Sequence, residues 1–301
     1  MLDEYRRART DRLRGASRRQ QVEAGLLTCN LQQRLLSSVY AFSRTLKVHA
    51  RTMERIWAKQ EELPDAKRPC ATDLLEESAG ADDDRAELSE EELAALEDAQ
   101  VEEVTRRTAG GYDPTARERE LLSQMMIAAD AAGMRPEGKV RYLIDWIRGN
   151  LLEGDRWKEK RVIIFTEYED TLRYLRGCIE DVIAHTDRAE ERITVFHGPT
   201  PLDKREAIKL AFNEHPSKDP LRILLCNDAA REGLNLQAHC FNLFHFDVPW
   251  NPSRLEQRNG RIDRKLQLLT PSTAITSFTL SAWRTGCSRH WSGKPKRSAP
   301  S

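Results

Sequence analysis

The stretch Asp247-Val-Pro-Trp-Asn-Pro252 is followed, after three intervening residues, by Glu256-Gln-Arg-Asn-Gly-Arg-Ile-Asp-Arg264. Two arginines of the second segment, Arg261 and Arg264, are three positions apart, and this spacing puts both on one face of a helical turn. Guanidinium groups placed in this way can neutralise the charge of a phosphoryl group. An isolated pair of this kind is more often part of a basic surface helix. The surrounding residues therefore have to decide between the two interpretations.

An upstream segment and the arginine pair together resemble two motifs of superfamily-2 helicases. Leu221-Arg-Ile-Leu-Leu-Cys-Asn-Asp-Ala-Ala-Arg-Glu-Gly-Leu-Asn-Leu236 is similar to the fifth motif, and Gln257 to Arg264 is similar to the sixth. Trp250-Asn251-Pro252 narrows the resemblance to the Swi/Snf-type translocases on double-stranded nucleic acid. Within that branch, the bacterial relatives of the RNA-polymerase recycling ATPase and of DISARM-type phage-defence helicases are the most similar. The resemblance covers residues 139–267 and, faintly, 20–60.

This resemblance implies an α/β fold with a RecA-like parallel sheet and flanking helices, namely the second lobe of an ATP-dependent DNA translocase. The implied cofactor is ATP with Mg²⁺. However, the 301 residues contain neither a GxxxxGK[ST] loop nor an acidic box at the end of an apolar strand. These parts hold the phosphates and the metal, so we expect a fragment that is inactive without a separately encoded N-terminal ATPase lobe. The other implied partners are double-stranded DNA and either RNA polymerase or phage-defence proteins.

The resemblance also assigns roles to individual residues. Arg261 and Arg264 correspond to arginine fingers that stabilise transferred charge, while Gly233, Asn235 and Gln257 correspond to positions near the nucleotide. The implied contacts with the nucleic-acid backbone are Thr166, Gly198, Thr200, Asn227 and Asp228. For Thr166, capping of the following helix is the more conservative prediction, because a threonine at a strand-to-helix junction often does this. The fifth motif departs from the family at Ala230-Arg-Glu232, which puts its detailed contacts in doubt.

The charge of the chain is abundant but balanced. There are 48 basic and 48 acidic residues, so any nucleic-acid binding has to come from a local patch. The chain has no apolar run of membrane-spanning length and no signal-peptide pattern, which predicts a cytoplasmic protein without membrane contact. None of the six cysteines forms a CxxC pair, so we expect neither a disulfide nor a zinc site.

Residues 1–135 are predicted to be a helical, charged extension or insertion. The arginine-rich opening lacks a periodic apolar face and is expected to be frayed or surface-bound. From 31 to 63 the apolar residues follow helical spacing, which predicts one long helix or two shorter ones. Residues 73–103 carry fourteen acidic side chains against one basic side chain and indicate a linker followed by an acidic helix. Ser89-x-x-Glu92 and Thr115-x-x-Glu118 resemble capping boxes, and Gly133 with Pro136 should end the second helix. The stripe residues are Leu31, Leu35, Val39, Phe42, Leu46, Met53, Ile56 and Trp57.

Residues 136–267 alternate apolar runs with amphipathic segments, the pattern of a parallel α/β sheet. In such sheets the loops beyond the strand C-termini carry ligands, and every motif above falls on such a loop. We predict helices at 139–148, 169–185, 201–213 and 252–262, and strands at 161–165, 193–197, 221–226 and 241–246.

Residues 268–301 lose this periodicity, and the sequence predicts an irregular tail with no strand to complete the sheet. Codons exist for residues 269–301 such that a shift of one base gives an apolar strand and an amphipathic helix. We therefore hypothesise a frameshift near codon 268, which genomic DNA lacking such codons would refute.

Two other functions compete with the translocase lobe. One is a non-catalytic scaffold that binds nucleic acid or protein, and the other is a decayed fragment. A complete small-molecule enzyme is disfavoured, because no nucleophile, base and orienting group cluster in the sequence.

Overall fold

The computed structural model describes residues 1–59, 88–109, 116–133, 136–198, 200–227, 236, 238–249, 252–260 and 273–276. The chain divides into two compact units. The first unit consists of Met1–Arg141 with Tyr168–Tyr174, and the second unit consists of Tyr142–Glu167 with Leu175–Ser301. No helix in the described ranges is long and apolar enough to cross a bilayer.

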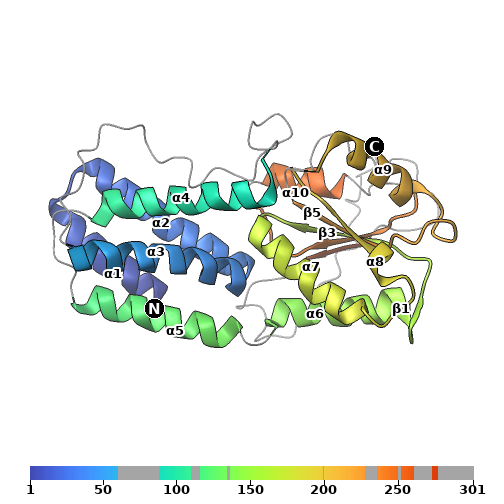
Figure 1. Cartoon of the computed structure of the whole chain (residues 1–301), viewed down its shortest axis with the longest axis horizontal. Coiled ribbons are helices and arrows are strands. Elements are labelled where there is room, and N and C mark those ends of the chain that lie inside the picture. Colours follow the sequence, from blue (N-terminus) through green and yellow to red (C-terminus); the bar gives the residue numbers. More distant parts are fainter. Residues whose placement is uncertain are drawn as a thin grey trace, which may run out of the picture. The chain divides into compact units, whose positions relative to one another are not determined.

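Helices make up the first unit (Figure 1). They are α1 (Leu2–Arg12), the 3₁₀ turn η1 (Leu13–Gly15), α2 (Arg18–Ser37), α3 (Val39–Lys59), α4 (Glu90–Ala109) and α5 (Ala116–Gly133). The stripe predicted between 31 and 63 is thus divided between two helices. The break is at Ser38, which is extended and whose hydroxyl accepts a 3.1 Å hydrogen bond from the N–H of Ala41. This is an N-cap interaction, and it starts α3.

The core of the first unit contains most of the predicted stripe. Leu31, Phe42, Leu46 and Met53 are buried and pack with apolar residues of α1 and α5. Leu35 is an exception, because it is 37% exposed. The helical period thus identified the buried face, although not each of its members.

The prediction of a frayed or surface-bound opening segment was wrong. Arg9 and Arg12 turn inward from α1, and Arg12 forms a 2.8 Å ion pair with the fully buried Glu118 of α5. Arg12 also donates to the carbonyls of Thr108 and Ala109 at the end of α4, where a cation complements the helix dipole. These partners lie about a hundred positions away, so the local pattern of α1 could not reveal them.

The capping box at the start of α4 is confirmed. The N–H of Glu92 donates to Ser89 Oγ at 3.2 Å, and the N–H of Ser89 donates to the Glu92 carboxylate at 2.8 Å. These hydrogen bonds lower the pKa of Glu92. The second predicted box is not supported, since Glu118 pairs with arginines of α1 and Thr115 is outside the described residues. Helix α5 ends at Gly133 as predicted.

The second unit contains the predicted parallel sheet. Its strands follow the order β4-β5-β3-β6-β7, with every neighbouring pair parallel. The strands are β3 (Val162–Thr166), β4 (Ile193–Phe196), β5 (Ile223–Asn227), β6 (Asn242–His245) and β7 (Thr273–Thr276). A short antiparallel pair, β1 (Leu152–Glu153) and β2 (Arg156–Trp157), precedes them.

Helices flank this sheet on both faces. They are α6 (Gly138–Leu151), α7 (Glu169–Ile183), α8 (Ala189–Arg192), α9 (Leu202–Asn213) and α10 (Pro252–Asn259). Figure 1 shows α9 and α10 above the strands and α6 below them. All residues of the central strands β3 and β5 are buried, as expected for a parallel sheet covered on both faces.

The prediction that no strand follows residue 268 was also wrong. Strand β7 pairs with β6 from Asn242 opposite Thr273 to His245 opposite Thr276. The β-branched residues of Thr-Ala-Ile-Thr suit an extended chain, and this short run was overlooked among the surrounding polar residues.

Three buried arginines organise the amino-terminal edge of the sheet, and their donors meet mainly backbone carbonyls. Arg161 donates to the carbonyls of Leu221, Phe212 and Ala211, at 2.9, 2.5 and 3.1 Å. Arg222 and Arg192 bind other carbonyls of the loop between α9 and β5. Burial, and then repulsion by these two neighbours, lowers the pKa of Arg222 to about 10.

Candidate functional site

Polar side chains gather at the carboxyl-terminal edge of the sheet. Thr166 ends β3 and Asn227 ends β5, and the two are paired directly in the parallel register. Both are buried. Asp247 follows the neighbouring strand β6 by two residues. The motifs predicted from the sequence thus converge where open α/β sheets bind their ligands.

The carboxylate of Asp247 links the ends of two strands. Its Oδ2 accepts a 2.6 Å hydrogen bond from the hydroxyl of Thr166. The N–H of Glu167 donates to both carboxylate oxygens, at 2.9 and 3.1 Å. The predicted capping role of Thr166 was therefore wrong, because its hydroxyl donates to Asp247 while α7 begins only at Glu169.

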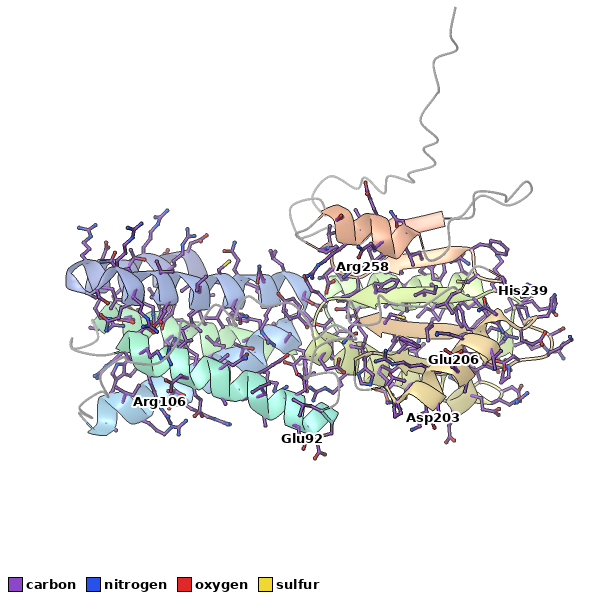
Figure 2. All side chains as sticks on the ribbon, turned by 90° about the horizontal axis from the view of Figure 1, so that it is seen from above. Glu92, Arg106, Asp203, Glu206, His239 and Arg258 are labelled. Atoms are coloured by element: carbon purple, nitrogen blue, oxygen red, sulfur yellow. The ribbon has the colours of Figure 1, made fainter. Side chains whose placement is uncertain are left out.

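Two buried arginines attach helix α10 to this junction. Arg258 donates to the carbonyl of Asp247 at 2.8 Å, pairs with its carboxylate at 3.6 Å and stacks over the ring of Phe165. Arg254, one turn earlier, pairs with Glu167 at 3.4 Å. Figure 2 shows Arg258 on α10. The orientation of α10 is thus fixed by charged contacts with the residues that end β3 and follow β6.

At neutral pH, Arg254 and His245 at this junction each have one defined protonation state. Burial, and secondly the charge of Arg258, lower the pKa of Arg254 to about 10, so that it stays protonated at neutral pH. Burial lowers the pKa of His245 to about 4, although its hydrogen bond with Asn259 raises it. His245 is consequently neutral at neutral pH, and its Nε2 lies 2.9 Å from Oδ1 of Asn259.

The loop after β4 forms a compact turn at the same edge. The N–H of His197 donates to Thr200 Oγ1 at 3.0 Å, and the N–H of Thr200 donates to the carbonyl of His197 at 3.1 Å. Arg205 on α9 donates to the carbonyls of Thr200 and Gly198, at 2.7 and 2.6 Å. A threonine hydroxyl that accepts one hydrogen bond still has its own hydrogen to donate.

The structure therefore brings together some of the predicted site residues. Thr166 and Asn227 are adjacent, Gly198 and Thr200 share one turn, and Gln257 is exposed on α10. The remaining predicted residues lie outside the described ranges: Asp228, Gly233, Asn235, Arg261 and Arg264. In the described ranges, no group of three or more His, Cys, Asp or Glu side chains could hold a metal ion.

Sequence reasoning missed the residues that join these elements. Asp247, Arg254 and Arg258 received no role, although the spacing of the two arginines by four residues puts them on one face of a helix. That spacing was the available signal. The partners Glu167 and Asp247 could not be identified before the parallel order of β3 and β6 was known.

Comparison with known proteins identifies the domain that contains this edge. The helicase conserved C-terminal domain matches residues 138–265. Over 106 residues the chain is 35% identical to an uncharacterized ATP-dependent helicase, YqhH, of Bacillus subtilis, covering 35% of this chain and 17% of that protein. Over 133 residues it is 31% identical to the RNA polymerase-associated protein RapA of Yersinia enterocolitica, covering 42% of this chain and 12% of RapA. The chain thus spans less than a fifth of the length of these relatives.

Solved structures give weaker similarities. The C-terminal part of the Fun30 ATPase domain aligns with a TM-score of 0.38 and 19% identity, over 77% of this chain and 79% of that one. The Hef helicase domain of Pyrococcus furiosus aligns with a TM-score of 0.36 and 16% identity, over 62% and 33% of the two chains. The sequence matches confirm the predicted resemblance to Swi/Snf-type superfamily-2 helicases, and residues 138–265 of this chain match the helicase conserved C-terminal domain.

Proposed function

We propose that this chain supplies the second RecA-like lobe of an ATP-dependent translocase on double-stranded DNA. This proposal is supported by the match to the helicase C-terminal domain and by the similarity to YqhH, which is named as an ATP-dependent helicase. In this function the lobe contributes arginine fingers and contacts with the DNA backbone. Its action on DNA would take place in the cytoplasm.

The attachment of α10 is the observation that carries the proposal. Arg258 and Asp247 hold this helix against the end of β3. Arg261 and Arg264 follow Arg258 by three and six positions. The backbone that carries arginine fingers has to be held rigidly, because catalysis of phosphoryl transfer depends almost entirely on positioning and electrostatic stabilisation. We infer that the buried arginines of α10 serve the fold, whereas Arg261 and Arg264 serve the reaction.

ATP with Mg²⁺ would be bound jointly with a lobe that carries a phosphate-binding loop and an acidic box. This chain would contribute Gly233, Asn235 and the side chain of Gln257, which is exposed on α10 and therefore accessible to a ligand. Arg254 and Arg258 are buried against their carboxylates and do not fit this role. The metal would be held by the other lobe.

DNA would be held by the loops after β3, β4 and β5. Thr200 with Gly198, and the polar residues Asn227 and Asp228, are the proposed backbone contacts. For Thr166 we propose an indirect part, since its hydroxyl donates to Asp247. The name of RapA makes RNA polymerase a candidate partner, with phage-defence proteins as the alternative.

An ATPase assay tests the proposal. The chain is mixed with a separately supplied lobe from the neighbouring reading frame, with and without duplex DNA. We expect DNA-stimulated hydrolysis only in the mixture, with a loss of about 10³-fold or more in Arg264→Ala. The exposed Arg148→Ala is the matched control and should retain activity.

The outcomes separate the alternatives. If the mixture does not hydrolyse ATP although the chain binds the other lobe and DNA, a non-catalytic scaffold replaces the proposal. If the chain is folded but binds neither, it is a decayed fragment. Hydrolysis that persists in Arg264→Ala would refute the arginine-finger assignment.

A further inference from the structure

The arginines of the opening segment include an inward and an outward group, while Arg6 and Arg19 pair with carboxylates of their own helices. Seven arginines occur among the first nineteen residues. Arg9 and Arg12 are directed inward, where Glu118 and the end of α4 neutralise them. The fold depends on these two. The others require a separate explanation, because a charge that packs against nothing adds little to stability.

Arg7, Arg14 and Arg18 form the outward group, and all three are exposed. Within the described ranges, neither Arg7 nor Arg18 has an ion-pair partner. Arg14 pairs with Asp11, and both side chains are more than half exposed, so this pair is weak and readily exchanged. Arg7 lies on α1, and Arg14 lies on the 3₁₀ turn η1 that follows α1 directly.

The start of α2 brings Arg18 close to this group and to the end of α4. The side-chain amide of Gln21 donates to the carbonyls of Leu13 and Arg14, at 3.1 and 3.4 Å. The side chain of Gln20 donates to the carbonyl of Arg107 at 3.4 Å. The last turn of α4, with the half-exposed Arg106, therefore lies next to the first turn of α2.

These four residues, Arg7, Arg14, Arg18 and Arg106, are named the arginine end of the first unit. Figure 2 shows Arg106 and Glu92 at opposite ends of α4. The far end of that helix begins with Glu91 and Glu92 in exposed positions. The carboxylates near the arginine end pair with arginines, two of which, Arg14 and Arg106, belong to it. The pairs are Asp3 with Arg6, Glu4 with Arg117, Asp11 with Arg14, Glu23 with Arg19 and Arg107, and Glu102 with Arg55 and Arg106.

We propose that the arginine end binds the phosphate backbone of double-stranded DNA, as a contact separate from the motifs of the helicase domain. The chain has no net charge, so attraction to DNA must come from such a local surplus. Guanidinium groups suit phosphate oxygens. The four arginines come from α1, η1, α2 and α4, and each of these elements contacts at least one of the others. The contact is independent of sequence, because it involves phosphates alone.

Salt-dependent binding tests this proposal with the full chain, without ATP and without a second lobe. The anisotropy of a labelled 20-base-pair duplex is measured over a series of NaCl concentrations. We compare the wild-type chain with the triple variant Arg7→Gln, Arg14→Gln, Arg18→Gln. The control triple, Arg141→Gln, Arg148→Gln, Arg156→Gln, makes the same charge change at equally exposed positions. Circular dichroism of all three proteins confirms equal helix content.

Each phosphate contact contributes about 0.9 to the slope of log K against log salt. The first triple should therefore reduce the magnitude of that slope by about 2.7 and weaken binding at least about tenfold at low salt. The control triple should change the slope by less than about 0.9, which is the contribution of one phosphate contact. Three results would overturn the proposal. The wild-type chain does not bind the duplex, the first triple leaves the slope unchanged, or both triples lose affinity equally.

The alternative is that the arginine end binds an acidic protein in place of DNA. Binding of poly-glutamate, compared with binding of the duplex, distinguishes the two ligands. Arginine-dependent binding to poly-glutamate that is tighter than binding to the duplex would reassign the surface to a protein partner. The result is also separable from the translocase proposal. Arg264→Ala should leave this DNA contact intact, whether or not the mixed lobes hydrolyse ATP.

Discussion

The hydroxyl of Thr166 donates a 2.6 Å hydrogen bond to Oδ2 of Asp247, so the end of β3 and the second residue after β6 share a buried contact. The same carboxylate receives the N–H of Glu167 and faces the guanidinium of Arg258. A single side chain thus connects two parallel strands to the helix that precedes the proposed arginine fingers. Its removal should affect the lobe more than the loss of an ordinary ion pair.

Replacement of Asp247 by asparagine tests this connection. The variant keeps the shape but loses the charge opposite Arg258, and it can direct an amide donor at the N–H of Glu167. We expect a loss of about 2–4 kcal/mol in the free energy of unfolding, measured by chemical denaturation. Asp145→Asn removes an exposed carboxylate on α6 and should change stability by less than about 0.5 kcal/mol. Equal effects of the two substitutions would contradict the connection.

Glu118 is expected to be the most sensitive carboxylate of the first unit. It is fully buried between Arg9 and Arg12, so Glu118→Gln leaves two buried cations without a counter-charge. The expected cost is about 3–5 kcal/mol, seen as a lowered midpoint of thermal unfolding. Glu120→Gln on the same helix breaks an exposed pair with Arg117 and alters an exposed hydrogen bond from Gln124, so it should be nearly neutral. If Glu118→Gln leaves the midpoint of thermal unfolding unchanged, Arg9 and Arg12 do not need the carboxylate of Glu118 as a counter-charge.

His49 should make the first unit sensitive to acid. Its Nε2 lies 2.6 Å from the hydroxyl of Tyr5 and its Nδ1 lies 2.8 Å from that of Thr105. Burial, followed by the charges of Arg9 and Arg12, lowers its pKa well below 6.5. Below pH 6.5 the unfolded chain therefore binds a proton that the folded chain does not bind. Stability should fall by about 1.4 kcal/mol per pH unit as the pH decreases from 6.5.

Denaturation curves between pH 7.5 and 5 measure this dependence. His49→Asn should reduce the slope even if it lowers stability at pH 7.5, because His49 no longer titrates, whereas the buried His245 keeps its contribution. His185→Asn removes a histidine that is 60% exposed and should leave the slope unchanged. A slope as steep in His49→Asn as in the wild-type chain would assign the acid sensitivity to other groups.

Arg161 should not be replaceable by lysine. Its planar group reaches the carbonyls of Leu221, Phe212 and Ala211 at once, whereas the single ammonium of lysine cannot span them. Arg161→Lys should destabilise the second unit by about 2–4 kcal/mol, since buried carbonyls lose their donors. Arg156→Lys, at an exposed position, serves as the control. Faster proteolysis within residues 211–222 of Arg161→Lys would locate the effect.

The sequence was sufficient for the longer elements of the second unit, but not for the short elements β1, β2, α8 and β7 or for the contacts between elements. Apolar runs and their spacing predicted strand 161–165, observed as Val162–Thr166, and helix 169–185, observed as Glu169–Ile183. Such patterns are local and depend on side-chain period alone. The contact of Thr166 with Asp247 depends on which strands become neighbours, and no local pattern encodes that order.

In the opening helix, too, the sequence did not reveal contacts between residues that are far apart in the chain. Its arginines suggested a solvated segment, yet Arg9 and Arg12 are compensated by α4 and α5. A buried charge is stable only beside its partner, and that partner is remote in the chain. Conversely, the short strand Thr273–Thr276 has too few apolar residues for a period to be recognised, and it becomes a strand through pairing with β6.

The central position of β3 has a consequence for synthesis on the ribosome. Val162 pairs with Ile223 on one side and with Asn242 on the other, so both neighbours of the first strand of the parallel sheet are translated much later. The sheet cannot close until β6 has left the exit tunnel, whereas the hairpin of α2 and α3 forms from adjacent residues. The apolar run Val162–Phe165 is therefore exposed as an unpaired strand during that interval, and the nascent chain needs protection from aggregation at this point.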